Sequence, residues 1–290
     1  YFNKIKRGSI NMLKRISFLL SLFTLAIVLV ACGSSSTDDT NDANDANENA
    51  EEETTTEEND DKEVLIIGID DQFPPMGFRD ENNEIVGFDI DYARAAAEYM
   101  GVEVEFQPID WKTKETELTS GRIDLIWNGY TITEERKEKV NFTEPYLENA
   151  QVIAVLEDSD IQTLDDLEGK LIGLQALSSA MDAFEASPIA DTVESITEYK
   201  DNVLALNDLE AGRVDAVVID EVAIDYYMTE KEGTFRVLDE SLAPEQYGVG
   251  VRKEDEELLN RLQEALDQMN EDGTAAEISE KWFGEDKVLK

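Results

Sequence analysis

The chain of 290 residues contains no histidine and a single cysteine, Cys32. Without histidine, neither a Ser-His-Asp nor a Cys-His catalytic group can form, and no zinc site with histidine ligands is available. A single cysteine excludes a disulfide bond within the chain. Basic residues are also scarce, with 25 Lys and Arg against 67 Asp and Glu, a net charge of −42. We therefore expect a solvated acidic surface and no nucleic-acid partner, since a nucleic-acid-binding protein must supply cations to phosphates.

The longest apolar run, residues 16–30, is too short to span a membrane. It covers about fifteen residues, whereas a spanning helix needs ~20, and it follows basic residues and ends in small ones before Cys32. This pattern is typical of a lipoprotein signal peptide with its lipobox. We expect residues 1–31 to comprise upstream residues and the signal peptide, and Cys32 to carry lipid such as palmitate. A free structural thiol is the alternative.

The segment after the cysteine is dominated by Ser, Thr, Asn, Asp and Glu. Such a composition cannot build a core, so residues 32–63 are expected to form the lipidated cysteine and a disordered acidic linker. The protein would then be anchored at the extracellular face of the cell membrane, or at a periplasmic face where the cell has an outer membrane. Residues 64–290 are long enough for one large lobe or two small ones.

One phrase occurs twice, at residues 118–126 and again at residues 209–217. Each copy combines the end of a helix, a glycine stop at Gly121 or Gly212, and a buried strand with few polar residues. This is typical of an αβ unit in a parallel sheet. Two copies predict an α/β fold with two similar lobes. Because open α/β sheets bind ligands beyond the carboxyl ends of their strands, we expect the two lobes to share one cleft.

The spacing of apolar residues predicts the remaining elements. It predicts helices over 88–100, 112–120, 178–186, 202–211, 221–228 and 255–269. It predicts strands over 64–69, 102–106, 123–127, 150–155, 170–174, 214–220 and 246–251. The chain thus begins with a βαβ unit, and two prolines after the first strand are expected to prevent further regular pairing there. We expect a two-strand hinge near 151–155 and 246–251, with lobe 1 formed by 64–152 and 248–290 and lobe 2 by 153–247.

Arg136 is a candidate ligand for a carboxylate. Thr133 is placed to cap a short helix whose first turn holds Arg136. A guanidinium held there can bind a carboxylate bidentately, with Thr131 and the amide of Gly129 as further donors. The alternative is an ordinary solvated arginine paired with a glutamate.

Two further candidates lie where strands of the second lobe end. Ser178 and Ser179 begin a helix, whose free amides favour an anion, although one serine can equally serve only as an N-cap. Asp220 ends an apolar strand, where a buried carboxylate needs a cation such as a ligand ammonium. Its alternative role is to cap the following helix.

Three residues on loops of the first lobe complete the candidate set. Phe73 and Trp111 follow strands, where their rings can stack on a ligand side chain or simply cover the edge of the core. Asp70 can meet a basic group at the far end of a ligand, although a single Asp has little weight in so acidic a chain.

These motifs together resemble the family 3 extracellular solute-binding proteins of amino-acid ABC importers. The matching motifs run in order over residues 64–284 and follow the lipobox: Ile67 to Phe78, Val86 to Asp91, Leu118 to Asp124, Thr131 to Arg136, Phe142 to Tyr146, Asp166 to Lys170, and the last strand and helix up to Phe283. The resemblance implies a two-lobed, type II periplasmic-binding-protein-like fold that closes on a free L-amino acid.

The resemblance also implies roles for single residues. Arg136 would bind the α-carboxylate with Thr131, Gly129 and the amide of Ser179, and Asp220 would bind the α-ammonium. Phe73 and Trp111 match the stacking aromatic residues of the family, and Asp70 matches its side-chain selector. Leu177 departs from the glycine that the family usually has before the serine pair, and a leucine does not easily adopt a positive φ.

A receptor of this kind works as a monomer with a permease and an ATPase, needs no cofactor or metal, and is not an enzyme. Asp70 favours a polar or basic side chain on the ligand, although cystine or glutamine would suit the aromatic pair. A dehydratase or lyase on the same fold, with Asp220 or Asp70 as acid and base, is one alternative. A ligand-sensing module is another.

Overall fold

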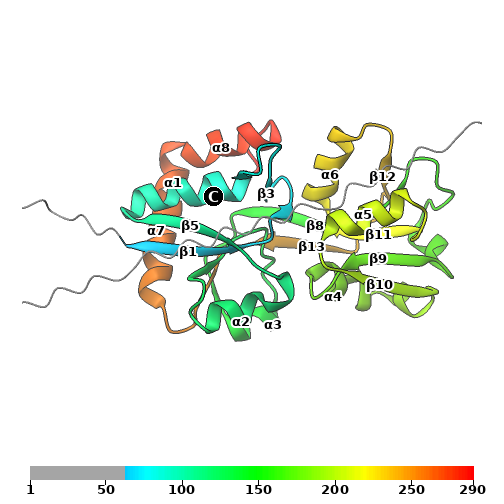
Figure 1. Cartoon of the computed structure of the whole chain (residues 1–290), viewed down its shortest axis with the longest axis horizontal. Coiled ribbons are helices and arrows are strands. Elements are labelled where there is room, and N and C mark those ends of the chain that lie inside the picture. Colours follow the sequence, from blue (N-terminus) through cyan, green and yellow to red (C-terminus); the bar gives the residue numbers. More distant parts are fainter. Residues whose placement is uncertain (1–62) are drawn as a thin grey trace, which may run out of the picture. The chain divides into compact units, whose positions relative to one another are not determined.

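The computed structural model describes residues 63–290, so the expected signal peptide, Cys32 and almost all of the acidic linker lie outside the described residues. Two sheets flanked by helices form two lobes of this part (Figure 1). None of its helices is both long enough and apolar enough to cross a membrane.

The sheet of lobe 1 has five strands in the order β5-β1-β6-β14-β7. They are β1 (Val64–Ile69), β5 (Glu103–Pro108), β6 (Leu125–Ile126), β7 (Asn141–Phe142) and β14 (Gly250–Val251). Strand β1 pairs in parallel with β5 and β6, whereas β14 pairs antiparallel with β6 and β7. The βαβ unit predicted at the start of the chain is confirmed, since α1 (Phe88–Met100) connects β1 to β5.

Helices cover both faces of this sheet. Figure 1 shows α1 and α8 (Thr274–Phe283) on one face and α2 (Lys114–Thr119) and α3 (Glu134–Lys139) on the other. Helix α7 (Glu256–Asp272) packs against α1 and α8. The helix predicted over 112–120 begins instead as a 3₁₀ turn, η1 (Trp111–Thr113), in which the Asp110 side chain accepts a hydrogen bond from the Lys112 amide.

The sheet of lobe 2 has the order β10-β9-β11-β8-β12, with β13 also paired to β8. Its strands are β8 (Leu147–Leu156), β9 (Leu171–Gln175), β10 (Ser195–Tyr199), β11 (Ala216–Asp220), β12 (Phe235–Val237) and β13 (Ala243–Tyr247). Its helices are α4 (Ser179–Glu185), α5 (Asn202–Glu210) and α6 (Glu221–Glu230), with 3₁₀ turns η2 (Leu164–Leu167) and η3 (Pro188–Asp191). Strand β9 pairs in parallel with β10 and β11, as the repeated phrase predicts.

Strands β8 and β13 form the link between the lobes. They pair antiparallel from Leu147 opposite Tyr247 to Gln151 opposite Ala243, and the chain then enters β14 in the other sheet. The single strand predicted over 246–251 is therefore wrong: Gly248 and Val249 separate β13 from β14, and each part belongs to a different sheet. The residue limits expected for the two lobes stay a prediction.

A small third sheet follows β1. It consists of β2 (Gln72–Phe73), β3 (Gly77–Arg79) and β4 (Ile85–Val86), all antiparallel. The expectation that the two prolines prevent pairing here is wrong. Pro74 and Pro75 lie in the connection between β2 and β3, where a missing amide costs no ladder hydrogen bond.

The two copies of the repeated phrase fold alike. Asp124 accepts a hydrogen bond of 2.9 Å from the Ile66 amide, and Asp215 accepts one of 2.8 Å from the Leu171 amide. Each aspartate thus fastens its strand to the start of the neighbouring parallel strand. Gly121 and Gly212 both adopt a positive φ, 73° and 66°, which ends the helix before each strand without a Cβ clash.

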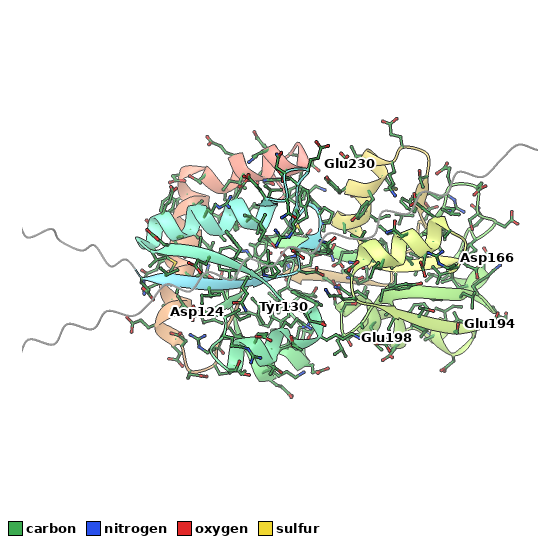
Figure 2. All side chains as sticks on the ribbon, viewed as in Figure 1. Asp124, Tyr130, Asp166, Glu194, Glu198 and Glu230 are labelled. Atoms are coloured by element: carbon green, nitrogen blue, oxygen red, sulfur yellow. The ribbon has the colours of Figure 1, made fainter. Side chains whose placement is uncertain are left out.

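Acidic side chains lie on the outside of both lobes. Asp166, Glu194, Glu198 and Glu230 are exposed (Figure 2). Most apolar residues of β1, β8 and β11 are buried with those of the surrounding helices. Most acidic side chains are therefore hydrated, whereas the few buried charged side chains lie in a protein environment away from water.

Candidate functional site

One cavity lies at the carboxyl ends of strands from both lobes. Its lining contains all but one of the residues predicted for a ligand site, together with two further amides: Asp70, Phe73, Trp111, Asn128, Gly129, Arg136, Gln175, Ser178, Ser179 and Asp220. Thr131 is the predicted residue that does not line the cavity. These residues come from segments far apart in the sequence, which the ends of β1, β6, β9 and β11 bring together.

Arg136 is a buried cation without a carboxylate partner. Thr133 caps α3 as predicted, accepting a 3.1 Å hydrogen bond from the Arg136 amide. Arg136 is 5% exposed, and its guanidinium donates to the Thr131 carbonyl at 2.9 Å and lies 4.7 Å from the centre of the Tyr130 ring. Within residues 63–290, no Asp or Glu lies within ion-pair distance of it. The alternative of a solvated arginine paired with a glutamate is therefore wrong, and a bound anion would neutralise this charge.

Asp220 is a buried anion. No Lys or Arg among residues 63–290 lies within ion-pair distance of it. Its Oδ1 accepts three hydrogen bonds, from Asn149 Nδ2 at 2.7 Å, Gln151 Nε2 at 2.9 Å and the Tyr247 hydroxyl at 2.6 Å. Burial, and next the charge of the nearby Glu245, raise the pKa of Asp220 to about 7 despite these hydrogen bonds. The residue stands at the N-cap position of α6, but its side chain does not cap the helix, so the predicted capping role is wrong.

Glu245 belongs to this site and was not predicted. Its Oε2 accepts hydrogen bonds from Gln151 at 2.9 Å, from Asn149 and the Thr131 hydroxyl at 3.1 Å, and from Ser179 at 3.3 Å. Thr131 therefore supports the cavity from behind, through Ser179 and Glu245. The sequence holds no local signal for Glu245, because it is one acid among many on a strand that pairs with a distant one.

Gly129 contributes differently from the prediction. Its amide donates a 2.6 Å hydrogen bond to Asp89 Oδ2, which also accepts from the Tyr146 hydroxyl at 3.0 Å. The amide predicted to bind a ligand carboxylate is thus already used within the protein. A Cβ on Gly129, whose φ is 57°, would lie 2.6 Å from the Phe73 ring, so this position requires glycine.

Asn128 and Gln175 were not predicted as ligand residues, although Gln175 ends β9 and Asn128 lies two residues after the end of β6. Asn128 is 1% exposed, and neither its Oδ1 nor its Nδ2 has a hydrogen-bond partner in the described part of the chain. Buried carboxamides are normally paired, so a bound polar group is a natural partner for Asn128. The rule of strand ends that found Asp220 could have found both residues.

Asp70 forms the acidic end of the cavity. Its Oδ1 accepts from the Gln72 amide at 3.0 Å, and its Oδ2 accepts from Gln175 Nε2 of lobe 2 at 2.7 Å. Burial raises its pKa to about 6, with smaller contributions from the charges of Asp201 and Asp71 and despite the two hydrogen bonds. No cation of the described residues pairs with it.

The two aromatic residues lie in the wall as predicted. Phe73 is 6% exposed and Trp111 is 7% exposed. The Trp111 ring packs edge to face on Tyr130 at 5.9 Å. Both predicted roles stay compatible with this placement, because the rings cover the core and also face the cavity.

Ser178 and Ser179 have different roles. Ser178 caps α4, accepting from the Met181 amide at 3.4 Å and donating to the Gln175 carbonyl at 2.7 Å, which confirms the capping alternative for this residue. Ser179 begins the helix, and its hydroxyl lies 3.0 Å from that of Thr131 in lobe 1. Leu177 adopts a φ of 54°, the conformation for which glycine is better suited, and exposes 53% of its surface.

The arrangement as a whole combines one buried cation with two buried anions around a small polar cavity. No group of three His, Cys, Asp or Glu residues that could hold a metal ion occurs among residues 63–290. Chemically, the cavity can bind a ligand with a carboxylate at Arg136 and cationic or polar groups towards Asp220 and Asp70.

Comparison with known proteins gives a consistent result. The profile of the bacterial extracellular solute-binding proteins, family 3, matches residues 65–285. The L-cystine-binding protein TcyJ of Escherichia coli is 32% identical over 225 residues, which cover 77% of this chain and 84% of TcyJ.

Solved structures of related proteins agree with the family match. A substrate-binding protein of an ABC uptake transporter from Streptococcus pneumoniae, with bound histidine, has a TM-score of 0.76 and 43% identity over 78% of this chain and 95% of its own. An ancestral amino-acid-binding protein described as a precursor of cyclohexadienyl dehydratase has a TM-score of 0.71 and 35% identity, over 76% of this chain and 95% of its own.

Proposed function

The chain belongs to the bacterial extracellular solute-binding proteins of family 3, and we propose that it binds a free L-amino acid between its lobes and delivers it to an ABC importer. The observation that carries this proposal is the set of buried charges without charged partners in one cavity. Arg136 supplies a cation for the α-carboxylate, and Asp220 supplies an anion for the α-ammonium. An amino-acid zwitterion satisfies both, and neither charge is then left unpaired in a low-dielectric site.

The ligand side chain is proposed to be basic or polar. Arg136 is the cavity's only lining cation within the described residues, whereas Asp70 and Asp220 both supply carboxylates. A ligand with one carboxylate and two cationic groups therefore balances the charges. Asn128 and Gln175 add neutral donors and acceptors, which would also suit glutamine or cystine.

The membrane tether is part of the proposal. The apolar run before Cys32 and the acidic linker after it support a lipid anchor on this residue. The protein would then act as a monomer at the extracellular face of the membrane, or at a periplasmic face, beside its permease and ATPase. Closure of the lobes on the ligand would present the loaded form to the permease.

Replacement of Arg136 tests the carboxylate site. We expect Arg136→Ala to weaken amino-acid binding roughly 100-fold or more, because loss of one partner of a buried charge pair costs about 3–5 kcal/mol. The matched control is Arg122→Ala, an exposed arginine of the same lobe that pairs with Glu117. Calorimetric titration of the purified protein measures both, and unchanged affinity in Arg136→Ala would overturn the assignment.

A dehydratase or lyase is the second candidate. It is favoured by the relative described as a precursor of cyclohexadienyl dehydratase and by the raised pKa of Asp220, about 7, which suits a general acid or base. Mass spectrometry of the ligand recovered after prolonged incubation separates the two functions. An unaltered amino acid supports the receptor, and a product that has lost water or carbon dioxide supports the enzyme.

A further inference from the structure

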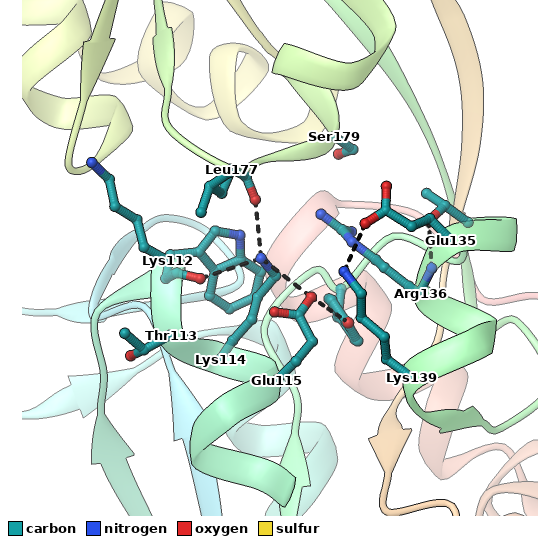
Figure 3. A network of polar contacts seen from close by, with 12 residues as sticks. Lys112, Thr113, Lys114, Glu115, Glu135, Arg136, Lys139, Leu177 and Ser179 are labelled. Atoms are coloured by element: carbon teal, nitrogen blue, oxygen red, sulfur yellow. Dashed lines mark hydrogen bonds and ion pairs between the residues drawn. The ribbon is translucent and has the colours of Figure 1, made fainter.

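Lys114 links the two lobes beside the cavity without lining it. Its side chain is buried, with 2% of the residue exposed. The ammonium donates to the Leu177 carbonyl of lobe 2 at 3.0 Å and to the Trp111 carbonyl of lobe 1 at 3.2 Å, and it lies 3.5 Å from Glu115 (Figure 3). A buried ammonium with three partners is held in one place, so the contact to Leu177 is a defined contact between the lobes.

The residue that Lys114 contacts has a strained backbone. Leu177 adopts a φ of 54°, and most of its side chain surface is not buried, so side-chain packing offers little to hold this conformation. The left-handed region is unfavourable for a non-glycine residue, because its Cβ lies too close to the following carbonyl oxygen. Another interaction must therefore offset the strain, and the hydrogen bond from Lys114 to the carbonyl of this residue is available for that.

The strained turn leads directly into the ligand site. Leu177 precedes Ser178 and Ser179, which line the cavity, and Ser178 closes the turn through the Gln175 carbonyl. A relaxed φ at Leu177 would redirect the chain immediately before both serines. The geometry of this part of lobe 2 thus depends on a side chain of lobe 1.

We propose that Lys114 is a positioning residue of the amino-acid site: its hydrogen bond across the cleft holds Leu177 in the left-handed conformation that places both serines. Lobe 1 then completes the binding surface of lobe 2 when the lobes meet, and opening relaxes the turn and releases the ligand. This inference rests on the proposed function, because it concerns the same site.

A simpler electrostatic role is distinguishable from positioning. Arg136, Glu115, Asp182 and Glu135 are charged groups that act on Lys114, and burial followed by the charge of Arg136 lowers the Lys114 pKa to about 8. Lys114 could therefore add positive potential for a ligand carboxylate. That effect does not depend on the backbone of Leu177, whereas positioning does.

The test is a double-mutant cycle with Lys114→Met and Leu177→Gly. The probes are L-arginine, L-lysine, L-histidine, L-glutamine and L-cystine, with affinity measured by calorimetry and dissociation by stopped flow. We expect Lys114→Met to weaken binding about 10- to 100-fold, mainly through faster dissociation, and Lys112→Met, an exposed neighbour, to leave it unchanged. Because glycine adopts a positive φ without strain, Lys114→Met should cost less than about 3-fold in the Leu177→Gly background.

Either of two other results would overturn the inference. Equal affinity of Lys114→Met and wild type shows that the contact is dispensable, and an equal loss in both backgrounds shows an electrostatic role. The two failures are distinguishable. The proposed function fails if wild type binds neither these five probes nor any other common amino acid, whereas this inference fails alone if wild type binds a ligand and the cycle gives either result above. Should Lys114→Met not fold, Lys114→Leu enters the same cycle, since leucine also removes the donor to the Leu177 carbonyl and is apolar in this buried position.

Discussion

Buried carboxyl groups are the residues that set this site apart from the acidic surface. Asp89 is fully buried, and Asp70 and Asp220 are 8% and 6% exposed. In each, burial outweighs the hydrogen bonds and raises the pKa from 3.8 to between about 6 and about 7. The folded chain therefore holds protons that the unfolded chain releases, so each carboxyl makes stability fall as pH rises from about 4 to about 7.

Asp89 allows this effect to be tested outside the cavity. Burial raises its pKa to about 7, so ionisation of Asp89 should cost about 2–3 kcal/mol of stability between pH 5 and pH 8. We expect Asp89→Asn, which keeps an acceptor for the Gly129 amide, to remove that part of the pH dependence. Urea unfolding at pH 5, 6, 7 and 8 measures it.

The control for this experiment is Asp166→Asn. Hydrogen bonds from Gln162 and Thr163 lower the Asp166 pKa below 3.8, so this residue stays ionised from pH 5 to pH 8 in both states. Its substitution should leave the slope of stability against pH unchanged over that range. An unchanged slope in Asp89→Asn would contradict the buried-charge account.

Among single residues, the sequence predicts those that end strands and misses those that form hydrogen bonds across the hinge. Asp70, Arg136 and Asp220 follow from strand ends and a capped helix start. Glu245 reaches Gln151, 94 positions away, only because β13 pairs with β8, and no local pattern records that pairing. The use of the Gly129 amide by Asp89 is equally non-local, since 40 positions separate them.

Short elements carry the functional residues, while long ones carry the core. The buried strand β1 and the amphipathic helix α1 have the limits that apolar spacing predicts, because nothing interrupts their patterns. Helix α3 has only six residues, fewer than an isolated helix needs to be stable in water. Its position, and that of Arg136, therefore depends on its cap and its packing.

Removal of the α3 cap should affect stability and binding together. Thr133→Ala leaves the Arg136 amide without its acceptor, which costs about 1 kcal/mol. We expect a several-fold weaker affinity, because the first turn that orients the guanidinium frays. Calorimetric titration and urea unfolding measure the two effects, and Thr133→Ser, which keeps the hydroxyl, should restore both. Lower stability with full affinity would show that the Thr131 carbonyl and Tyr130 suffice to hold Arg136.

Elements whose pairing is decided by tertiary contacts were harder to predict. The prolines after β1 suggested a loop, yet the chain on either side of them pairs as β2 and β3. The returning segment looked like one strand, but it is divided between the two sheets at Gly248 and Val249. In both places the apolar pattern is too short to distinguish a strand from a turn between strands.

The molecule as a whole brings two half-sites together. Lobe 1 supplies Arg136 and Asp70, lobe 2 supplies Asp220 and the serine pair, and hydrogen bonds such as that from Gln175 to Asp70 join the lobes around the cavity. The repeated phrase predicts this duplication, since each copy builds the same strand connection. It does not predict which side chains meet across the cleft, because that depends on how the lobes close.

The central claim is that this cavity binds a free amino acid. The direct test is calorimetric titration of the purified protein, unfolded and refolded to remove any ligand carried through purification, against the twenty common amino acids and L-cystine. We expect one-to-one binding of one or a few ligands, foremost those with basic or polar side chains, with the ligand recovered unchanged. Absence of binding to every member of this panel, or recovery of a chemically altered ligand, would contradict the account.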